Sequence, residues 1–339
     1  MATLAAGQLT LADWAKRLDP DGAVSAAAEL LSQTYDILDD VAWQMGNLPT
    51  GHRVTVRTGL PTVGWRALNS GIAVSKSTTA QIDESVGLLE GRSHIDKKLA
   101  DLNGNTEAFR ASENSAFLEA MNQQFTSTLF NGNPGVDPKQ FLGLSGRYAS
   151  LTGSNAQNLI TAGGSGSDNA SIWLIVWGPE TVFAVFPKGS KAGLTARDLG
   201  EEAVADGSGN FYQAMRYLFQ WDAGLVVKDW RYIVRIPNID VSDWIGVTGT
   251  QATSAATNLI KLMSRAIDRI PNLNMGRAAF YANRTVYSGL RLQALEKSNQ
   301  VLTINDAMTQ FGMPRKETQF LGVPLRLVDA LGVAETVVA

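Results

Sequence analysis

The chain has 339 residues, of which 45% are hydrophobic and 18% are charged, and its formal net charge is −3. A chain of this length can bury one large core or form two domains. It lacks the basic field with which a dedicated DNA-binding protein neutralises phosphates. It has no cysteine and two histidines, which excludes disulfides and thiolate metal sites and argues against a histidine-rich metal centre.

The charged fraction lies below the roughly one quarter typical of soluble domains. Low charge leaves less surface that must face water, which favours extensive contact with other subunits over the alternative of a large core alone. The most apolar run, residues 172–186, is shorter than the ~20 residues of a membrane span, and Gly178-Pro179-Glu180 interrupts it. The N-terminus lacks a basic start followed by an apolar block. We therefore expect neither a membrane span nor a secretion signal.

The N-terminal part predicts helical pieces followed by a long hairpin. Helices are expected within residues 1–45, the second of them over residues 26–43. Residues 47–82 then change character, because residues 52–58 and 72–79 alternate between polar and apolar side chains, as paired strands do. Few residues of this hairpin could fill a core of their own, so we expect it to lie on another surface, often that of a neighbouring subunit.

A long amphipathic helix is predicted over residues 105–130, with an apolar stripe of Phe117, Met121 and Phe125. At 1.5 Å per residue it would be roughly 38 Å long, and Asn131-Gly132 supplies a left-handed stop signal. We expect the stripe to pack on the β-rich block that follows. The side that carries Glu113 and Gln123 would then be free to face the interior of an assembly or a neighbour.

Residues 141–240 are predicted to be β-rich. Two buried strands joined by a tight turn are expected over residues 172–186, and further strands over 211–221 and 225–236. The intervening segments 155–171, 186–200 and 204–209 are expected to be loops or turns. After residue 242 an α/β pattern returns, with expected helices over 253–270 and 284–297, a helix opened by a capping-box-like sequence at 303–306, and strands over 278–282 and 321–328.

No constellation indicates catalysis or ligand binding. The loop at residues 163–167 is glycine-rich, but no helix and no lysine follow it as in a phosphate-binding loop. Asp36, Asp39 and Asp40 have helical spacing and no histidine partner, which indicates a solvated helix face. Arg92, Lys97 and Lys98 are interpreted in the same way, with contact to acidic neighbours or packaged nucleic acid as the alternative. We predict no catalytic, cofactor-binding or metal-binding residues.

The tryptophans of the β-rich block lie in apolar strand patterns, so we interpret them as core or subunit-interface residues rather than as a stacking platform for sugars or bases. They are Trp173, Trp177, Trp221, Trp230 and Trp244. An enzyme or sugar-binding protein built on this block, with Asp206, Asp222 and His94 as the residues to test, remains an alternative, although the three show no convergent pattern.

The order of the segments resembles one known family. Residues 58–78, 129–144 (LFNGNPGVDPKQFLGL), 221–240 and 320–331 (FLGVPLRLVDAL) are similar to the major capsid proteins of tailed bacteriophages, which have the Hong Kong 97-like fold. The resemblance spans nearly the whole chain and implies an α+β protein that assembles into an icosahedral head shell around double-stranded DNA. An encapsulin-type nanocompartment shell of the same fold is the alternative.

The resemblance also implies a domain map. Residues 1–46 would be an N-terminal arm and residues 47–95 the extended loop that crosses the adjacent subunit. Residues 96–241 would form the peripheral domain around a spine helix at 105–130, and residues 242–339 the axial domain. In the founding phage the axial domain follows the spine helix directly, whereas here the β-rich block comes first, which indicates a rearranged strand order.

The partners implied by the resemblance are other copies of the chain in hexamers and pentamers, a portal, and a decoration protein in some members. Because no cleavable scaffolding region precedes the arm, scaffolding would come from a separate protein, or the chain is already mature. Packaged DNA would lie nearby without sequence-specific binding, and the shell would assemble in the bacterial cytoplasm to become part of the virion.

Lys76 lies in the loop that forms isopeptide crosslinks in some members, but we identify no acidic catalyst for it and expect no crosslink. Expected inter-subunit contacts are Arg57, Trp65, Arg66, Lys76, Glu113, Arg147 and Arg277.

Overall fold

The structure, a computed structural model, describes residues 33, 35–104, 106–206, 208–242, 259–296, 302–308 and 314–339. Its helices are α2 (Ile37–Asp40), α3 (Lys97–Ala100), α4 (Thr106–Asn131), α5 (Leu144–Arg147), α7 (Leu259–Arg269) and α8 (Arg284–Glu296). Its strands are β1 (Trp43–Met45), β2 (Gly51–Gly59), β3 (Thr78–Ser85), β4 (Gly87–Asp96), β5 (Asn169–Trp177), β6 (Val182–Phe186), β7 (Thr195–Ala205), β8 (Phe211–Val227), β9 (Ile233–Asp240), β10 (Arg277–Ala282), β11 (Leu302–Met308), β12 (Pro314–Phe320) and β13 (Val323–Leu327).

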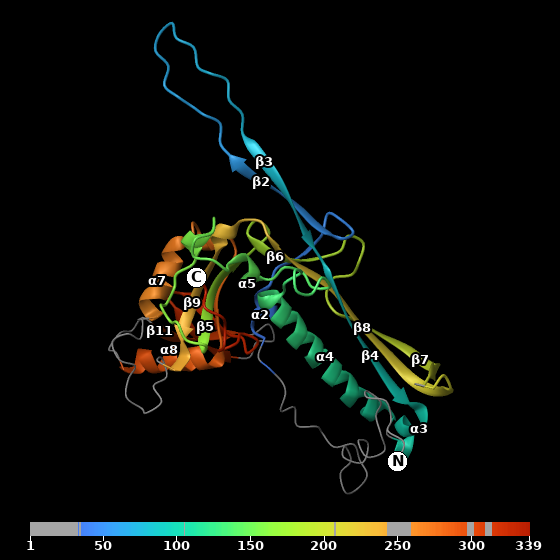
Figure 1. Ribbon diagram of the computed structural model, residues 1–339. Coiled ribbons are helices and arrows are strands. Elements are labelled where there is room, and N and C mark those ends of the chain that lie inside the picture. The colour runs from blue at the N-terminus through green and yellow to red at the C-terminus, as the bar shows by residue number, and fades with distance from the viewer. Residues whose placement is uncertain are drawn as a thin grey trace.

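The body is built on one mixed sheet. Among the described residues the sheet has 11 strands, with the path β11-β12-β13-β10-β5-β6-β8-β4 and with β1, β7 and β9 paired beside β6, β8 and β5. Figure 1 shows α7 and α8 against one end of this sheet and α4 lying along β4 and β8 at the other. The β2–β3 hairpin rises away from both ends. No helix among the described residues is long and apolar enough to cross a bilayer.

One hydrophobic core lies beneath α4, and it confirms the predicted long helix and its stripe. Met121, Phe125 and Leu129 are buried, and Phe117 packs against the same cluster. The Phe125 ring stacks on Trp221 of β8 with centroids 4.4 Å apart, and Phe117 stacks on Phe219 at 5.7 Å. Offset aromatic stacking of this kind stabilises a helix on a sheet beyond its area burial.

A second core lies beneath α7 and α8, where alternate residues of β5 and β9 face the helices. The expected apolar face of the helix at 253–270 is confirmed over its described part, since Leu259, Met263 and Ile270 are buried. The predicted start of the next helix is also confirmed, because Asn283 Oδ1 accepts a hydrogen bond from the Thr285 backbone N–H at 2.9 Å. Residues 243–258 lie outside the described residues.

The expected hairpin over residues 172–186 is wrong, although both of its strands exist. β5 and β6 are parallel and share one register pair, Trp177 with Val182. The chain steps sideways by one strand at the turn between them and continues in the same direction. β6 then pairs antiparallel with β8 and parallel with β1, so its partners are distant in sequence.

Two further strand predictions need correction in the β-rich block. The segment 186–200 was expected to be a loop, but β7 begins at Thr195 and pairs along β8. The expected strand 225–236 is broken, because Asp229 accepts from the Arg231 backbone N–H and caps a short 3-10 turn at Trp230–Tyr232. β8 ends before this turn and β9 begins after it.

Two expected helices are also wrong where the structure describes them. The capping-box-like sequence at 303–306 lies in strand β11, which pairs antiparallel with β12 from Leu302 to Met308. The expected helix 26–43 is helical only at Ile37–Asp40 among its described residues, and Trp43 pairs with Ala184 in the sheet. Strand pairing overrides the local helix signal in both places, with a partner distant in sequence for Trp43 and with the next strand along the chain for β11. The N-terminal helical pieces before residue 33 lie outside the described residues.

Strand pairing crosses the borders of the expected domain map. β4, which falls in the expected extended loop 47–95, pairs with β8 over its whole length. β5, which falls in the expected segment 96–241, pairs with β10 of the expected segment 242–339 on one side and with β9 on the other. The strand order therefore follows tertiary pairing and not the chain order of the map.

Candidate subunit interface

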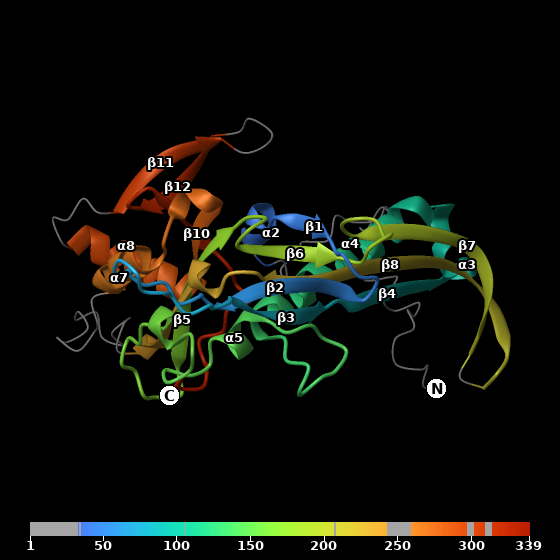
Figure 2. The same cartoon turned by 90° about the horizontal axis from the view of Figure 1, so that it is seen from above.

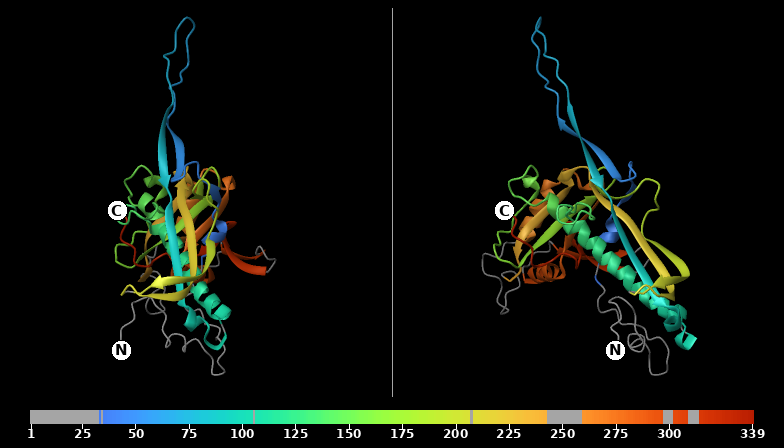
Figure 3. Two further views of the ribbon diagram at one scale, coloured as in Figure 1. Left: turned by 90° about the vertical axis from the view of Figure 1, so that its right-hand side faces the viewer. Right: turned by 45° about the vertical axis from the view of Figure 1, so that its right-hand side comes forward.

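A hairpin projects from the body. β2 and β3 pair antiparallel from Gly51–Ser85 to Gly59–Thr78, which confirms the predicted hairpin. Residues 60–77 carry no strand, so the alternating run at 72–79 becomes a strand only at its end. Figures 1 and 3 show this tip far from the body in every view, and Figure 2 shows β2 and β3 passing across it at their base.

The tip is apolar and basic, and its side chains face solvent. The exposed apolar residues are Leu60 (80%), Val63 (86%), Trp65 (105%), Leu68 (91%), Ile72 (54%) and Val74 (102%). Three of the expected inter-subunit contacts, Trp65, Arg66 and Lys76, lie here exposed, and Arg57 is exposed on β2. Residues 57–80 contain no Asp or Glu. A contiguous exposed apolar segment of this kind marks an interaction site.

The base of the hairpin is fixed by a buried ion pair. Arg147 Nη1 and Nη2 each lie 2.6 Å from a carboxylate oxygen of Glu84, and both side chains are largely buried. Arg147 also donates to the carbonyl oxygens of Leu142 and Leu225. The terminal guanidinium nitrogens of Arg147, an expected inter-subunit residue, thus contact residues of its own chain, between the last turn of α5 and the hairpin.

Gln33 and Tyr35 lie against helix α4. Glu119 accepts hydrogen bonds from the Gln33 backbone N–H, from the Tyr35 hydroxyl and from Gln123. Burial, with a contribution from Glu119, raises the pKa of Tyr35 to about 12. The helix side expected to be free is thus partly covered by the chain itself, and both Gln123 and Glu113 are only half-exposed.

Asp40 is the centre of a buried polar cluster, which corrects the expected solvated helix face. Its side chain is buried, and its carboxylate lies 3.2 Å from Arg326 and 3.7 Å from Arg277. The Tyr281 hydroxyl donates to it at 2.9 Å and accepts from Trp177 Nε1 at 2.8 Å. Burial raises the pKa of Asp40, and the two arginines oppose that shift.

Arg277, another expected inter-subunit residue, is half-accessible at the rim of this cluster. It donates to the Asp39 carbonyl oxygen at 2.6 Å, and its side chain remains 59% exposed. The cluster therefore holds α2 and the N-terminal segment against β10 and β13. Sequence patterns missed it because Asp40 lies more than two hundred residues along the chain from Tyr281 and Arg326.

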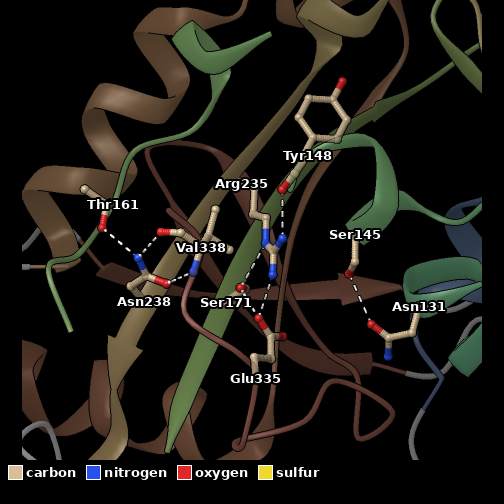
Figure 4. Close-up of polar contacts among 9 residues, drawn as sticks. All are labelled: Asn131, Ser145, Tyr148, Thr161, Ser171, Arg235, Asn238, Glu335 and Val338. Atoms are coloured by element: carbon tan, nitrogen blue, oxygen red, sulfur yellow. Dashed lines mark hydrogen bonds and ion pairs between the residues drawn. The ribbon is translucent and has the colours of Figure 1, made fainter. Parts of the chain in front are cut away.

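The C-terminal segment is tied to β9 through Arg235, as Figure 4 shows. Arg235 is buried, and its guanidinium lies 2.8 Å from Glu335 and donates to the Tyr148 carbonyl oxygen at 2.8 Å. Its Nε donates to Ser171, whose hydroxyl contacts Glu335 in turn. A buried arginine with every one of these partners fixes the tail against the sheet.

Asn238 also binds the C-terminal segment, through two hydrogen bonds. Its Nδ2 donates to the Val338 carbonyl oxygen and its Oδ1 accepts from the Val338 N–H, both at 2.8 Å (Figure 4). Asn238 has φ 59°, a left-handed conformation that asparagine tolerates better than most residues. Its side-chain amide thereby pairs with the tail as a neighbouring strand would.

The residues considered for an enzyme do not form a site. Asp206 accepts hydrogen bonds from the backbone N–H groups of Asn210 and Ser208 in an exposed turn, and these lower its pKa. His94 accepts from Arg216. The described residues contain no group of three or more His, Asp or Glu that could hold a metal ion. Trp173, Trp177 and Trp221 are core residues, as predicted, while Trp244 lies outside the described residues.

Comparison with known proteins identifies the family. The family model described as major capsid protein GP7 matches residues 19–339. A chain in the cryo-EM structure of bacteriophage Epsilon15 is 32% identical, with a TM-score of 0.74 and 100% of both chains covered. The capsid of bacteriophage JBD30 matches at 9% identity and a TM-score of 0.48, over 90% of this chain and 95% of that chain. No curated protein sequence matches the chain.

The mixed α+β architecture is thus that of Hong Kong 97-like phage capsids, and the family match decides between a phage head and an encapsulin-type compartment in favour of the head. The described residues agree with a structural protein. The polar clusters around Asp40 and Arg235 hold separate segments of the chain together, and the exposed apolar residues lie on the hairpin tip, away from the body. The chain belongs to the major capsid protein GP7 family, and it is the non-enzymatic virion subunit that forms the icosahedral head of a tailed bacteriophage.

Proposed function

We propose that the β2–β3 hairpin joins neighbouring subunits of the shell by lying across an adjacent copy. The observation that carries the proposal is the row of exposed apolar side chains at residues 60–77. Burying one such side chain contributes about 1.5–3 kcal/mol, and none of the residues that the structure describes covers them. A second copy of the chain, present at high local concentration in a shell, is the partner that this surface fits.

The proposed domain borders follow strand pairing. α4 with β4, β7 and β8 would form the peripheral domain, since α4 packs on β4 and β8 and since β7 pairs along β8. α7 and α8 with β5, β9, β10 and β13 would form the axial domain, whose outer tips meet at the five-fold and six-fold axes of pentamers and hexamers. This moves β5 and β9 out of the peripheral domain and limits the extended loop to the segment that ends at Ser85.

The inter-subunit residues proposed on this basis are those that the structure leaves accessible. They are Arg57, Trp65, Arg66 and Lys76, exposed on the hairpin, and Arg277, exposed on the body, with the half-exposed Glu113 as a further candidate. A separate scaffolding protein, a portal and a decoration protein are proposed further partners. Packaged DNA would lie nearby without sequence-specific contacts, which the net charge of −3 supports.

Deletion of residues 58–78 tests the hairpin. The deletion joins Arg57 to Thr79 as a new two-residue turn, and the base of the hairpin can keep its pairing up to Val56 and Ala80. The body is therefore expected to stay folded, with a cooperative unfolding transition. Shells are expected to be absent from electron micrographs at concentrations where the intact chain forms them. Shells of ordinary size from the shortened chain would refute the role of the hairpin.

A further inference from the structure

A pocket opens between α4, the start of β4 and the loop that follows α4. Its volume is about 260 Å³, and Phe125, Phe141 and Trp221 line it. All three rings are buried, while Leu88 at the same pocket is 71% exposed. An apolar cavity of about 150 Å³ is large enough to bind benzene, so this pocket has room for one large aromatic side chain.

We propose that Trp65 from the hairpin of a neighbouring copy occupies this pocket, an inference that rests on the docking role proposed above. Trp65 is 105% exposed, so it is the largest side chain that the tip presents. It does not reach the pocket of its own chain, because the tip is directed away from the body (Figures 1 and 3). Contact residues that dominate an interface are commonly tryptophans seated in a partner's pocket.

Charge complementarity supports the same pairing. The tip carries Arg66 directly after Trp65 and has no acidic residue. The pocket is lined by Glu90 and Asp137 against one lysine, Lys139, so its rim is net acidic. Glu90 accepts a side-chain hydrogen bond from Gln220, and the Asp137 carboxylate accepts one from a backbone N–H. Both carboxylates keep oxygen lone pairs for an incoming guanidinium.

Cysteine pairs in this naturally cysteine-free chain test the contact. Assembled shells of a chain carrying Gly64→Cys, which keeps Trp65 beside it, and Leu88→Cys are expected to give a ladder of linked chains on a non-reducing gel after mild oxidation; a side chain at Gly64 meets no other atom of the described residues. The control pair is Gly64→Cys with Phe211→Cys, since Phe211 is 75% exposed on β8 outside the pocket lining. Shells that crosslink equally at both pairs, or only at the control pair, would overturn the assignment.

A second measurement separates the pocket from hairpin docking in general. Trp65→Ala is expected to raise the concentration needed for shell formation by about tenfold or more, as loss of a central anchor does. Val74→Ala, at an equally exposed tip position, is expected to raise it at most about threefold. Equal effects would overturn the pocket and leave the hairpin role intact, whereas no effect of either substitution would overturn both.

Discussion

Glu84 and Arg147 form a two-point ion pair, with 2.6 Å between each guanidinium nitrogen and its carboxylate oxygen. Glu84 lies near the end of β3, and Arg147 lies in the last turn of α5. The pair therefore sets the direction in which the hairpin leaves the body. A planar guanidinium and a carboxylate that meet at two points resist rotation about the contact, which a single hydrogen bond does not.

Removing one partner of this pair is expected to be costly. Arg147→Met leaves the Glu84 carboxylate buried without its cation, and we expect a loss of about 3 kcal/mol in the free energy of unfolding of the unassembled chain. Urea denaturation measures it. The double substitution Glu84→Gln with Arg147→Met is expected to recover part of the loss. If the stability loss of the double variant equalled the sum of the losses of the two single variants, the two residues would be acting independently.

The stacking of α4 on the sheet supplies a second prediction. Phe125→Ala removes a buried ring from contact with Trp221 and Phe141, and we expect destabilisation by about 3–5 kcal/mol. Leu118→Ala on the same helix is the matched control, because Leu118 is 37% exposed, and it is expected to change stability by about 0.5 kcal/mol or less. Thermal unfolding of both variants makes the comparison, and similar losses would contradict the assigned core.

The buried Asp40 gives a pH dependence with a definite sign. Its folded pKa is raised above the usual 3.8 by burial, so the folded state holds the proton more tightly than the unfolded state. The stabilisation from this group is complete below the unfolded pKa and is lost as pH rises through the folded pKa. Wild-type stability relative to Asp40→Asn is therefore expected to increase as pH is lowered into that window.

Denaturant titrations across the acid range measure this difference. Asp83→Asn is the control of opposite sign, because a hydrogen bond from Arg53 lowers the pKa of Asp83 and its contribution is lost as pH falls. A difference between the wild type and Asp40→Asn that stays constant with pH would contradict the raised pKa of Asp40.

The Asn238 fastening predicts a local effect at the C-terminal segment. Asn238→Leu removes both hydrogen bonds to Val338, and we expect a loss of about 1–3 kcal/mol because two backbone groups lose their partners. Hydrogen exchange at the Val338 amide is expected to accelerate more than exchange in β5. Asn238→Asp keeps the acceptor for the Val338 N–H and is expected to show a smaller acceleration. Unchanged exchange at the Val338 amide in the leucine variant would show that the hydrogen bonds from Asn238 do not hold the C-terminal segment in place.

Several parts of the fold and of the interface were predictable from local pattern. The apolar stripe of α4, its end at Asn131, the Asn283 cap and the hairpin at residues 51–85 all rest on side-chain periodicity or on one capping residue, which neighbours in sequence are enough to specify. The accessibility of Trp65 follows for the same reason, since the residues around it offer no core.

Other features required the tertiary structure. β7 has an almost wholly exposed, polar sequence, so only its pairing with β8 makes it a strand. β11 contains a helix start signal that its partner β12 overrides.

The amino-acid sequence by itself thus determined the elements in which apolar side chains repeat regularly. It also determined the order of segments that is shared with phage capsid proteins. Tertiary structure alone decided that Asp40 is buried, that Arg147 serves the hairpin base, and that Trp221 lines an open pocket. The physical reason is that burial and ion pairing depend on residues brought together across the chain, whereas periodicity depends on residues a few positions apart.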